Sequence, residues 1–162
     1  MTVSVETREP EAAVIREARP DDVDAIAGLL AGYARMGNVL PRPKSEILRN
    51  IQMFRVAEAG SVMAGCGALE VFTADLAEIR SLVVAEASKG TGVGRRLVER
   101  LVEDARGRGH RRLMALTYVP GFFHRLGFET VPRNTFPEKV WGICVTCYKF
   151  HRCDEIAVLR YL

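Results

Sequence analysis

A glycine-rich loop between an apolar strand and a helix is the feature that most constrains this chain. The whole unit occupies Arg80–Leu97, and its loop carries three glycines at alternating positions: Gly90, Gly92 and Gly94. Glycine lets the backbone approach a ligand without a side chain between them. The helix that follows presents free N–H groups and the positive end of its dipole, which suit a phosphate. Because Arg95 and Arg96 lie in the first helical turn, where cations are unfavourable, an anion is expected beside them. The sequence therefore predicts a site for a phosphate-bearing cofactor.

Composition limits the remaining possibilities. The chain has 162 residues, of which 48% are hydrophobic and 27% charged, as in an ordinary soluble domain. A net charge of +3 is too small to indicate nucleic-acid binding. There is no apolar run of 18 residues and no signal-peptide pattern, so we expect no membrane partner and a cytoplasmic location. In that compartment the four cysteines are expected to be reduced thiols.

Hydrophobic periodicity predicts one mixed α/β domain over residues 14–162, after a flexible N-terminus at residues 1–13. The expected strands are Val14–Arg19, Phe54–Glu58, Val62–Phe72, Leu76–Val84, Arg112–Tyr118, Phe128–Val131 and Glu155–Leu162. The expected helices are one from Asp21 to Gly37, one over Lys44–Asn50, one over about Gly92–Arg108, and a short one from Pro120 to Gly127. Two glycines inside the third strand, Gly65 and Gly67, indicate a bulge or a close backbone approach.

Two familiar phosphate loops do not fit the glycine spacing. A dinucleotide site needs Gly-x-Gly-x-x-Gly, and here the third glycine comes one residue early. A P-loop needs Gly-x-x-x-x-Gly-Lys-Ser/Thr, which this loop lacks. The spacing therefore favours a different phosphate-bearing molecule.

Three segments in order resemble the GNAT acetyltransferase superfamily. The run from Lys89 to Gly94 is similar to its acyl-CoA loop, Arg/Gln-x-x-Gly-x-Gly/Ala, with lysine in the first position. Glu78–Val84 resembles the family's fourth strand, and Phe122–Phe128 its aromatic-x-x-Leu-Gly-Phe segment. The resemblance implies a central mixed, twisted sheet of about seven strands flanked by helices, acetyl-CoA as co-substrate and no metal.

Two further segments resemble the amino-acid N-acetyltransferases that make N-acetylglutamate. These are the connector Leu40–Pro43 and the tail Pro137–Glu155, in a chain that looks like a short stand-alone form. The implied activity is acetylation of the α-amine of L-glutamate or L-glutamine, the first step of arginine biosynthesis. Acetylation of another small amine and a non-catalytic CoA-binding regulator are the alternatives.

The resemblance also assigns roles in catalysis and cofactor binding. Glu78 occupies the position of the general base, which is needed because an α-amino group with a pKa of about 8 is largely protonated at neutral pH. The family's tyrosine acid is replaced by Phe123, which is still expected to contact the cofactor, so Tyr118, with Thr117 behind it, is the nearest substitute as acid. Backbone groups of Leu82 and Val84 are expected to pair with the pantetheine arm. The pyrophosphate is expected on a run flanked by two cations, which comprises Lys89, Gly90, Thr91, Gly92, Val93, Gly94 and Arg95.

Cations are expected to hold the acceptor carboxylates. Arg42 and Arg80 are the main candidates, and Lys139 is a weaker one. Alternation along the strand puts Arg80 on the same face as Glu78. Thr117 is expected at this site as well.

The tail and the cysteines allow other interpretations. Trp141 and Phe150 are expected to pack the tail over the acceptor site or against a second subunit of a homodimer. Cys144, Cys147, His151 and Cys153 resemble a zinc site only loosely, so structural thiols are the preferred interpretation. Cys66 is expected to be a buried small residue rather than a nucleophile.

Overall fold

The computed structural model describes residues 12–35, 42–132, 135–136 and 155–162. Within these residues the chain forms one sheet of seven strands. The strands are β1 (Val14–Glu17), β2 (Phe54–Ala59), β3 (Val62–Val71), β4 (Leu76–Val84), β5 (Arg112–Thr117), β6 (Glu129–Thr130) and β7 (Ile156–Tyr161). The α-helices are α1 (Val23–Ala34), α2 (Lys44–Arg49), α3 (Val93–Gly107) and α4 (Pro120–His124). Each predicted strand and helix is present, with ends that differ by a few residues.

Three short 3-10 helices have no counterpart in the sequence prediction. They are η1 (Pro20–Asp22), η2 (Ile51–Met53) and η3 (Glu86–Ser88). Each one lies at the end of a longer element, where a single tight turn leaves little periodicity to detect. The predicted end of the first helix at Gly37 falls outside the described residues, and α1 itself ends at Ala34.

The strands follow the order β1-β2-β3-β4-β5-β7-β6. Every neighbouring pair is antiparallel except β4 and β5, which run parallel and are joined through α3. Parallel neighbours need a long crossover connection, and α3 supplies it. The sheet is therefore mixed, as expected.

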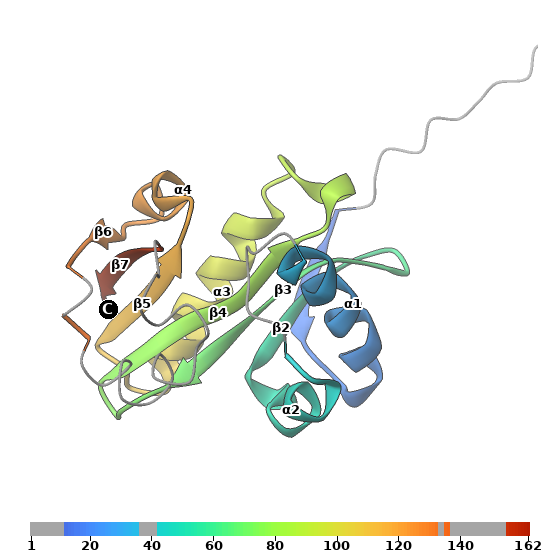
Figure 1. Cartoon of the computed structure of the whole chain (residues 1–162), viewed down its shortest axis with the longest axis horizontal. Coiled ribbons are helices and arrows are strands. Elements are labelled where there is room, and N and C mark those ends of the chain that lie inside the picture. Colours follow the sequence, from blue (N-terminus) through green and yellow to red (C-terminus); the bar gives the residue numbers. More distant parts are fainter. Residues whose placement is uncertain (1–11, 36–41, 133–134, 137–154) are drawn as a thin grey trace, which may run out of the picture.

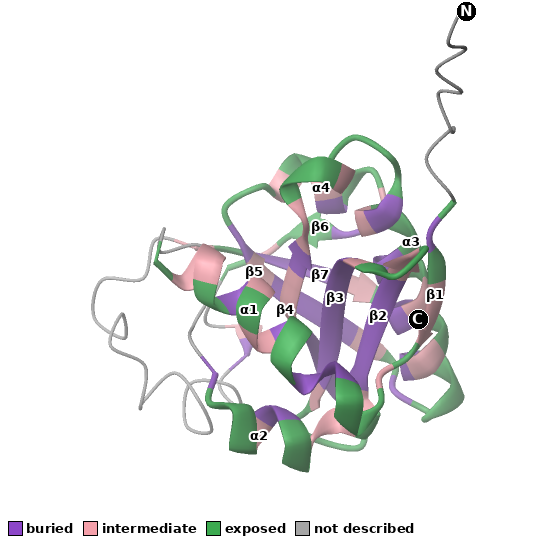
Figure 2. Cartoon of the chain, turned by 90° about the vertical axis from the view of Figure 1, so that its right-hand side faces the viewer, coloured by how far each residue is buried: buried purple, intermediate pink, exposed green. Residues whose placement is uncertain are grey.

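Helix α3 covers one face of the sheet. Its apolar stripe is buried against β2, β3 and β4 and consists of Leu97, Val98, Leu101, Val102 and Ala105. The predicted amphipathic pattern is confirmed, and burial of each large side chain contributes about 1.5–3 kcal/mol. The same cluster includes Phe123 of α4 and Phe128, which follows that helix. In Figure 2 the buried positions lie along the central strands beneath the more exposed helices.

Helices α1 and α2 cover the opposite face. Ile26 and Leu30 of α1 and Ile47 of α2 pack against Phe54 of β2. Figure 1 shows these two helices together on one side of the sheet and α3 on the other. No helix among the residues described is long and apolar enough to cross a membrane.

A bulge interrupts the central strand β4. Cys66 pairs with Val83 and Ala68 with Arg80, so the single residue Gly67 of β3 faces two residues of β4. One of these two, Ser81, has φ = 55°, the only positive φ of a non-glycine residue in the described part of the chain. The glycines of β3 predicted an irregularity near Gly67 but did not indicate that β4 carries the extra residue.

Close backbone approach accounts for Gly65 and Gly67. A Cβ on Gly65 would lie 2.8 Å from the carbonyl oxygen of Val83, and a Cβ on Gly67 would lie 3.0 Å from Cδ1 of Leu101. The first distance is shorter than real Cβ contacts, and the second would require the Leu101 side chain to shift, so glycine at these two positions lets β3 pack closely against β4 and α3.

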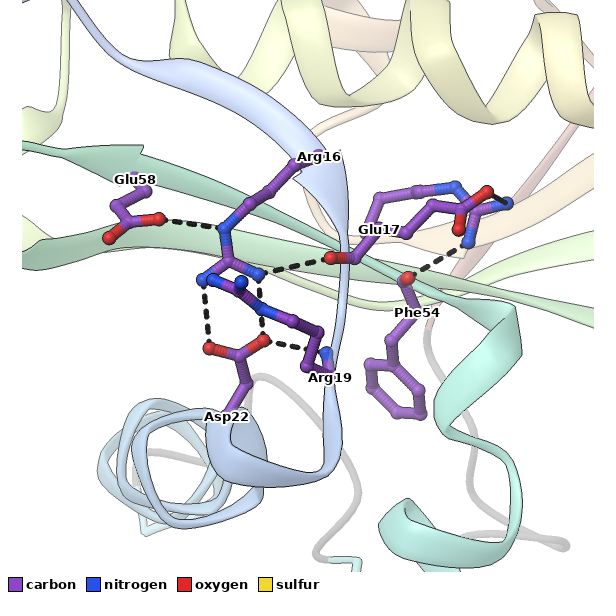
Figure 3. A network of polar contacts seen from close by, with 7 residues as sticks. Arg16, Glu17, Arg19, Asp22, Phe54 and Glu58 are labelled. Atoms are coloured by element: carbon purple, nitrogen blue, oxygen red, sulfur yellow. Dashed lines mark hydrogen bonds and ion pairs between the residues drawn. The ribbon is translucent and has the colours of Figure 1, made fainter.

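An arginine joins the first strand to the start of α1 (Figure 3). Arg16 donates two hydrogen bonds to the carboxylate of Asp22, at 2.8 and 2.9 Å, and one to Glu58 at 2.7 Å. The backbone N–H of Arg19 also donates to Asp22, at 2.7 Å. The Arg16 guanidinium lowers the pKa of the Asp22 carboxyl below its usual value. This network fixes η1 and the entry to α1 against the sheet.

We predict that Asp22→Asn destabilises the fold at neutral pH by about 1–3 kcal/mol, the usual contribution of hydrogen bonds to a charged group. Because the folded pKa is depressed, this stabilisation is present above the unfolded pKa of about 3.9 and is lost as pH falls through the folded pKa. Urea unfolding at pH 7 and at pH 3 should therefore show a difference from wild type that shrinks in acid. Asp21→Asn, at an exposed neighbour, is the control. An equal loss at both pH values would contradict the charge-based explanation.

Candidate active site

The two parallel strands at the centre of the sheet separate soon after they begin. β4 and β5 pair only at Leu76–Arg112, Ala77–Leu113 and Glu78–Met114. Beyond Glu78 no pair joins β4 to β5, although β4 continues to Val84 and β5 to Thr117. Figure 1 shows the two strands running side by side and then diverging. The carboxyl-terminal half of β4 therefore has a backbone edge that is not paired with β5.

Glu78 lies at the point where this separation begins. The residue is 3% exposed and faces Glu70 across the antiparallel pair with β3. A buried carboxylate requires compensating contacts. Its position at the last β4–β5 pair puts the predicted base at one end of the free edge.

Arg80 follows on the same face of β4, as alternation predicts. Its Nη1 lies 3.9 Å from Oε2 of Glu70, and its side chain is 15% exposed. The structure therefore brings together Glu78, Arg80 and a third residue, Glu70, which sequence analysis did not single out. Glu70 is found only when the register of β3 against β4 is known.

Arg42 reaches the same place from the segment before α2. Its side chain is 3% exposed, and its Nη2 lies 3.9 Å from the same oxygen of Glu70. Its Nε donates to Glu46 at 3.1 Å, its Nη1 donates to Ser81 Oγ at 3.0 Å, and its guanidinium stacks 5.1 Å from the centre of the Phe54 ring. Arg42 therefore contacts the bulge of β4 directly and holds the side chain of its left-handed residue.

The glycine loop joins the far end of β4 to α3. Gly90 and Gly92 have φ = 76° and 85°, which favours glycine at both positions, and Gly92 is the N-cap of α3. The first N–H groups of a helix have no intrahelical acceptor. In α3 these groups belong to the run from Val93 onward, so the predicted anion site has the expected donors.

Lys89 is positioned beside this loop by two neighbours. Its Nζ lies 2.8 Å from the Glu86 carboxylate and 5.2 Å from the centre of the Tyr33 ring. Hydrogen bonding to Glu86 and to Tyr33 raises the pKa of Lys89, so the side chain carries its positive charge at neutral pH. Thr91 turns its hydroxyl back to the Ser88 carbonyl within the loop.

The two arginines of the first turn have different partners. Arg95 forms an exposed ion pair with Glu99 at 3.0 Å, one turn along α3. Arg96 donates to the backbone carbonyl of Ala13 and so fastens the residue before β1. Arg95 thus lies beside the N-terminus of α3, whereas the Arg96 side chain is hydrogen-bonded to Ala13, just before β1.

Val84, one of the two residues predicted to meet pantetheine, lies on the β4 edge that faces away from β3. Ala85 donates its N–H to Ala64 of β3 at 2.7 Å. Since successive strand residues direct their backbone groups to opposite edges, those of Val84 point away from β3. The Val84 carbonyl accepts a hydrogen bond from Tyr33 at 2.8 Å. Leu82 packs its side chain toward the α3 side of the sheet.

The end of β5 and the residues that follow it lie on the other side of the gap between β4 and β5. Tyr118 is 38% exposed, whereas Thr117 is 7% exposed and accepts a hydrogen bond from the N–H of Val119 at 2.9 Å. Phe123 is 4% exposed and lies edge-on to both Phe122 and Phe128 within the core. Phe122 instead approaches the glycine loop, since a Cβ on Gly94 would lie 3.4 Å from its ring.

Other predicted residues are buried or lie outside the described part. Cys66 is fully buried, as predicted, and burial raises the pKa of its thiol to about 12. Lys139, Trp141, Phe150 and the group Cys144, Cys147, His151 and Cys153 lie outside the described residues. Within the described ranges, no group of three or more His, Cys, Asp or Glu residues is placed to hold a metal ion.

Residues 21–128 match the family model described as "Acetyltransferase (GNAT) family". The chain belongs to the GNAT acetyltransferase family. It is therefore an acyltransferase by family, and the fold and the glycine loop described above are those of a GNAT domain.

Several known proteins resemble this GNAT domain along most of its length. An uncharacterized N-acetyltransferase from Chlorobaculum tepidum is 38% identical over 148 residues, which cover 91% of this chain and 96% of the relative. An amino-acid acetyltransferase from Mycobacterium tuberculosis is 39% identical, with 92% of this chain and 83% of the relative covered. The structure of N-acetylglutamate synthase from Neisseria gonorrhoeae complexed with coenzyme A and N-acetyl-glutamate superposes with a TM-score of 0.84 at 29% identity. That match covers 95% of this chain but 36% of the longer synthase.

We predict that Cys66 is inert toward thiol reagents in the folded protein. A pKa of about 12 leaves roughly one thiolate in ten thousand at pH 8, and the thiolate is the reactive form. Iodoacetamide labelling at pH 8, followed by peptide mass spectrometry, should modify Cys66 at least a hundredfold more slowly in buffer than in urea. Equal rates in the two conditions would show that Cys66 is accessible in the native state.

Proposed function

We propose that this GNAT domain transfers the acetyl group of acetyl-CoA to the α-amine of L-glutamate or L-glutamine, an entry step for arginine biosynthesis. The observation that carries the proposal is the joining of Glu78, Arg80 and Arg42 at the end of the β4–β5 pairing. A base and two cations at the start of an open strand edge suit an acceptor that has both an amine and a carboxylate.

The cofactor would lie along the separation of β4 and β5. Its pyrophosphate would accept hydrogen bonds from the N–H groups at the start of α3, with Lys89 and Arg95 adding positive charge. Its pantetheine arm would pair with the free edge of β4 at Leu82 and Val84, as an added strand does. This arrangement brings the thioester toward Glu78.

In the proposed reaction, Glu78 takes a proton from the acceptor's ammonium group, directly or through a water molecule. The neutral amine then attacks the thioester carbonyl, and a backbone N–H of β4 stabilises the oxyanion. The nitrogen then releases its second proton to water, the carbon–sulfur bond breaks, and the electron pair leaves with the CoA thiolate. Tyr118, which is more exposed than Thr117, would donate a proton to that thiolate.

Amino-acid specificity is supported by the relatives. The amino-acid acetyltransferase from Mycobacterium tuberculosis aligns with 92% of this chain. The Neisseria synthase was solved with coenzyme A and N-acetyl-glutamate, so that protein binds both molecules. Release of CoA thiol, measured with acetyl-CoA and a panel of amino acids and other amines, tests the proposal directly. Absence of release with every amine would favour a CoA-binding regulator, and release only with amines other than L-glutamate and L-glutamine would favour another acceptor.

We predict that Glu78→Gln lowers kcat at neutral pH by about a hundredfold or more, the usual contribution of a general base. Glutamine keeps the shape of the buried side chain but cannot accept the proton. Steady-state kinetics should show KM for acetyl-CoA changing less than threefold. Glu103→Gln, at an exposed position on α3, is the matched control. Equal loss of turnover and acetyl-CoA affinity would refute the role of Glu78 as base.

Arg80→Ala should raise KM for the amino-acid acceptor by about tenfold or more, since a charge-assisted contact is removed. The KM for acetyl-CoA should stay near its wild-type value. Arg80→Lys should recover only part of the loss, because lysine keeps the charge but not the bidentate geometry. An unchanged acceptor KM in Arg80→Ala would remove this residue from the acceptor site.

A further inference from the structure

Glu70 occupies a position between the two arginines of the candidate site. Its Oε2 lies 3.9 Å from Nη2 of Arg42 and 3.9 Å from Nη1 of Arg80. It is also the cross-strand partner of Glu78, so the two carboxylates extend from neighbouring strands on the same face. Glu70 has no role in the proposed reaction as described above.

The charges around the acceptor position nearly cancel. Arg42 already pairs with Glu46 at 3.1 Å and shares Glu70 with Arg80. Two guanidinium groups are therefore matched by two carboxylates before any acceptor binds. Both arginines are largely buried, at 3% and 15% exposure, so solvent screens these charges poorly.

Glu70 is not fixed by hydrogen bonds to these arginines. A distance of 3.9 Å is an ion-pair distance and is too long for a hydrogen bond. The Glu70 side chain is 34% exposed, so it is partly open to solvent. A ligand with an N–H donor can therefore reach an acceptor here.

We propose that Glu70 is a specificity-determining residue that makes this site prefer an acceptor with one carboxylate and an amide side chain, such as L-glutamine, over L-glutamate. The inference rests on the proposed function. The acceptor's α-carboxylate binds to Arg42 and Arg80, and its side-chain amide NH₂ donates a hydrogen bond to Glu70. The side-chain carboxylate of L-glutamate would lie close to the carboxylates of Glu70 and Glu78. Repulsion between these like charges would weaken the binding of glutamate relative to glutamine.

The test compares kcat/KM for L-glutamine and L-glutamate, measured by CoA thiol release, in four proteins. They are wild type, Glu70→Gln, Glu70→Asp and the surface control Glu103→Gln. Wild type should prefer glutamine. Glu70→Gln should shift the glutamate-to-glutamine ratio of kcat/KM at least tenfold toward glutamate. Glu70→Asp, which keeps the charge, and Glu103→Gln should stay within threefold of the wild-type ratio.

Two results would overturn the inference while leaving the proposed function intact. One is a wild-type preference for glutamate, which needs no variant to be observed. The other is an unchanged ratio in Glu70→Gln that melts like wild type. If that variant does not fold, Glu70→Ser supplies the second neutral side chain, and the same tenfold shift is required. Wild type that acetylates neither amino acid would instead refute the proposed function, and the inference with it.

Discussion

The extra residue in β4 is the constraint on which the candidate site depends. A bulge bends its strand and increases the local twist, and this one lies just after the last pair between β4 and β5. The bend carries the end of β4 away from its parallel neighbour and leaves one backbone edge open. The left-handed conformation at Ser81 has an energetic cost, and a hydrogen bond from the buried Arg42 opposes it.

The surrounding packing supports this interruption of the sheet. Gly67 faces the two residues of the bulge, and Gly65 lets the Val83 carbonyl approach β3 closely. On one face α3 packs its apolar stripe across β2, β3 and β4, and on the other α1 and α2 cover Phe54. Because both faces of β3 and β4 are packed, the bend is held by the core rather than by the loop beyond it.

The candidate site has two parts: the polar side chains Glu78 and Arg80 on one face of the sheet, and the backbone edge of β4 where it separates from β5. Arg80 and Arg42, which precedes α2, both lie near Glu70, the cross-strand partner of Glu78, whereas Leu82 packs toward α3. The bulge lies between Arg80 and Val83 and changes which face the following side chains occupy. It therefore separates the acceptor groups from the stretch of β4 that leads to the glycine loop, so that one strand serves both ligands of the proposed reaction.

Local sequence patterns predicted the order of the elements, the glycine loop at the start of α3 and the position of Glu78 and Arg80 on one strand face. These features depend on local periodicity, on glycine's access to positive φ and on alternation along a strand, all of which are visible within a short window. The three-dimensional fold was needed to show that β4 carries the bulge, that Arg42 is buried against Ser81, and that Glu70 lies between two arginines. Each of these depends on the register of β3 against β4 or on contact between residues 39 positions apart, such as Arg42 and Ser81. A one-residue change of register would have moved Glu70 to the opposite face, so no local pattern could have placed it beside Glu78.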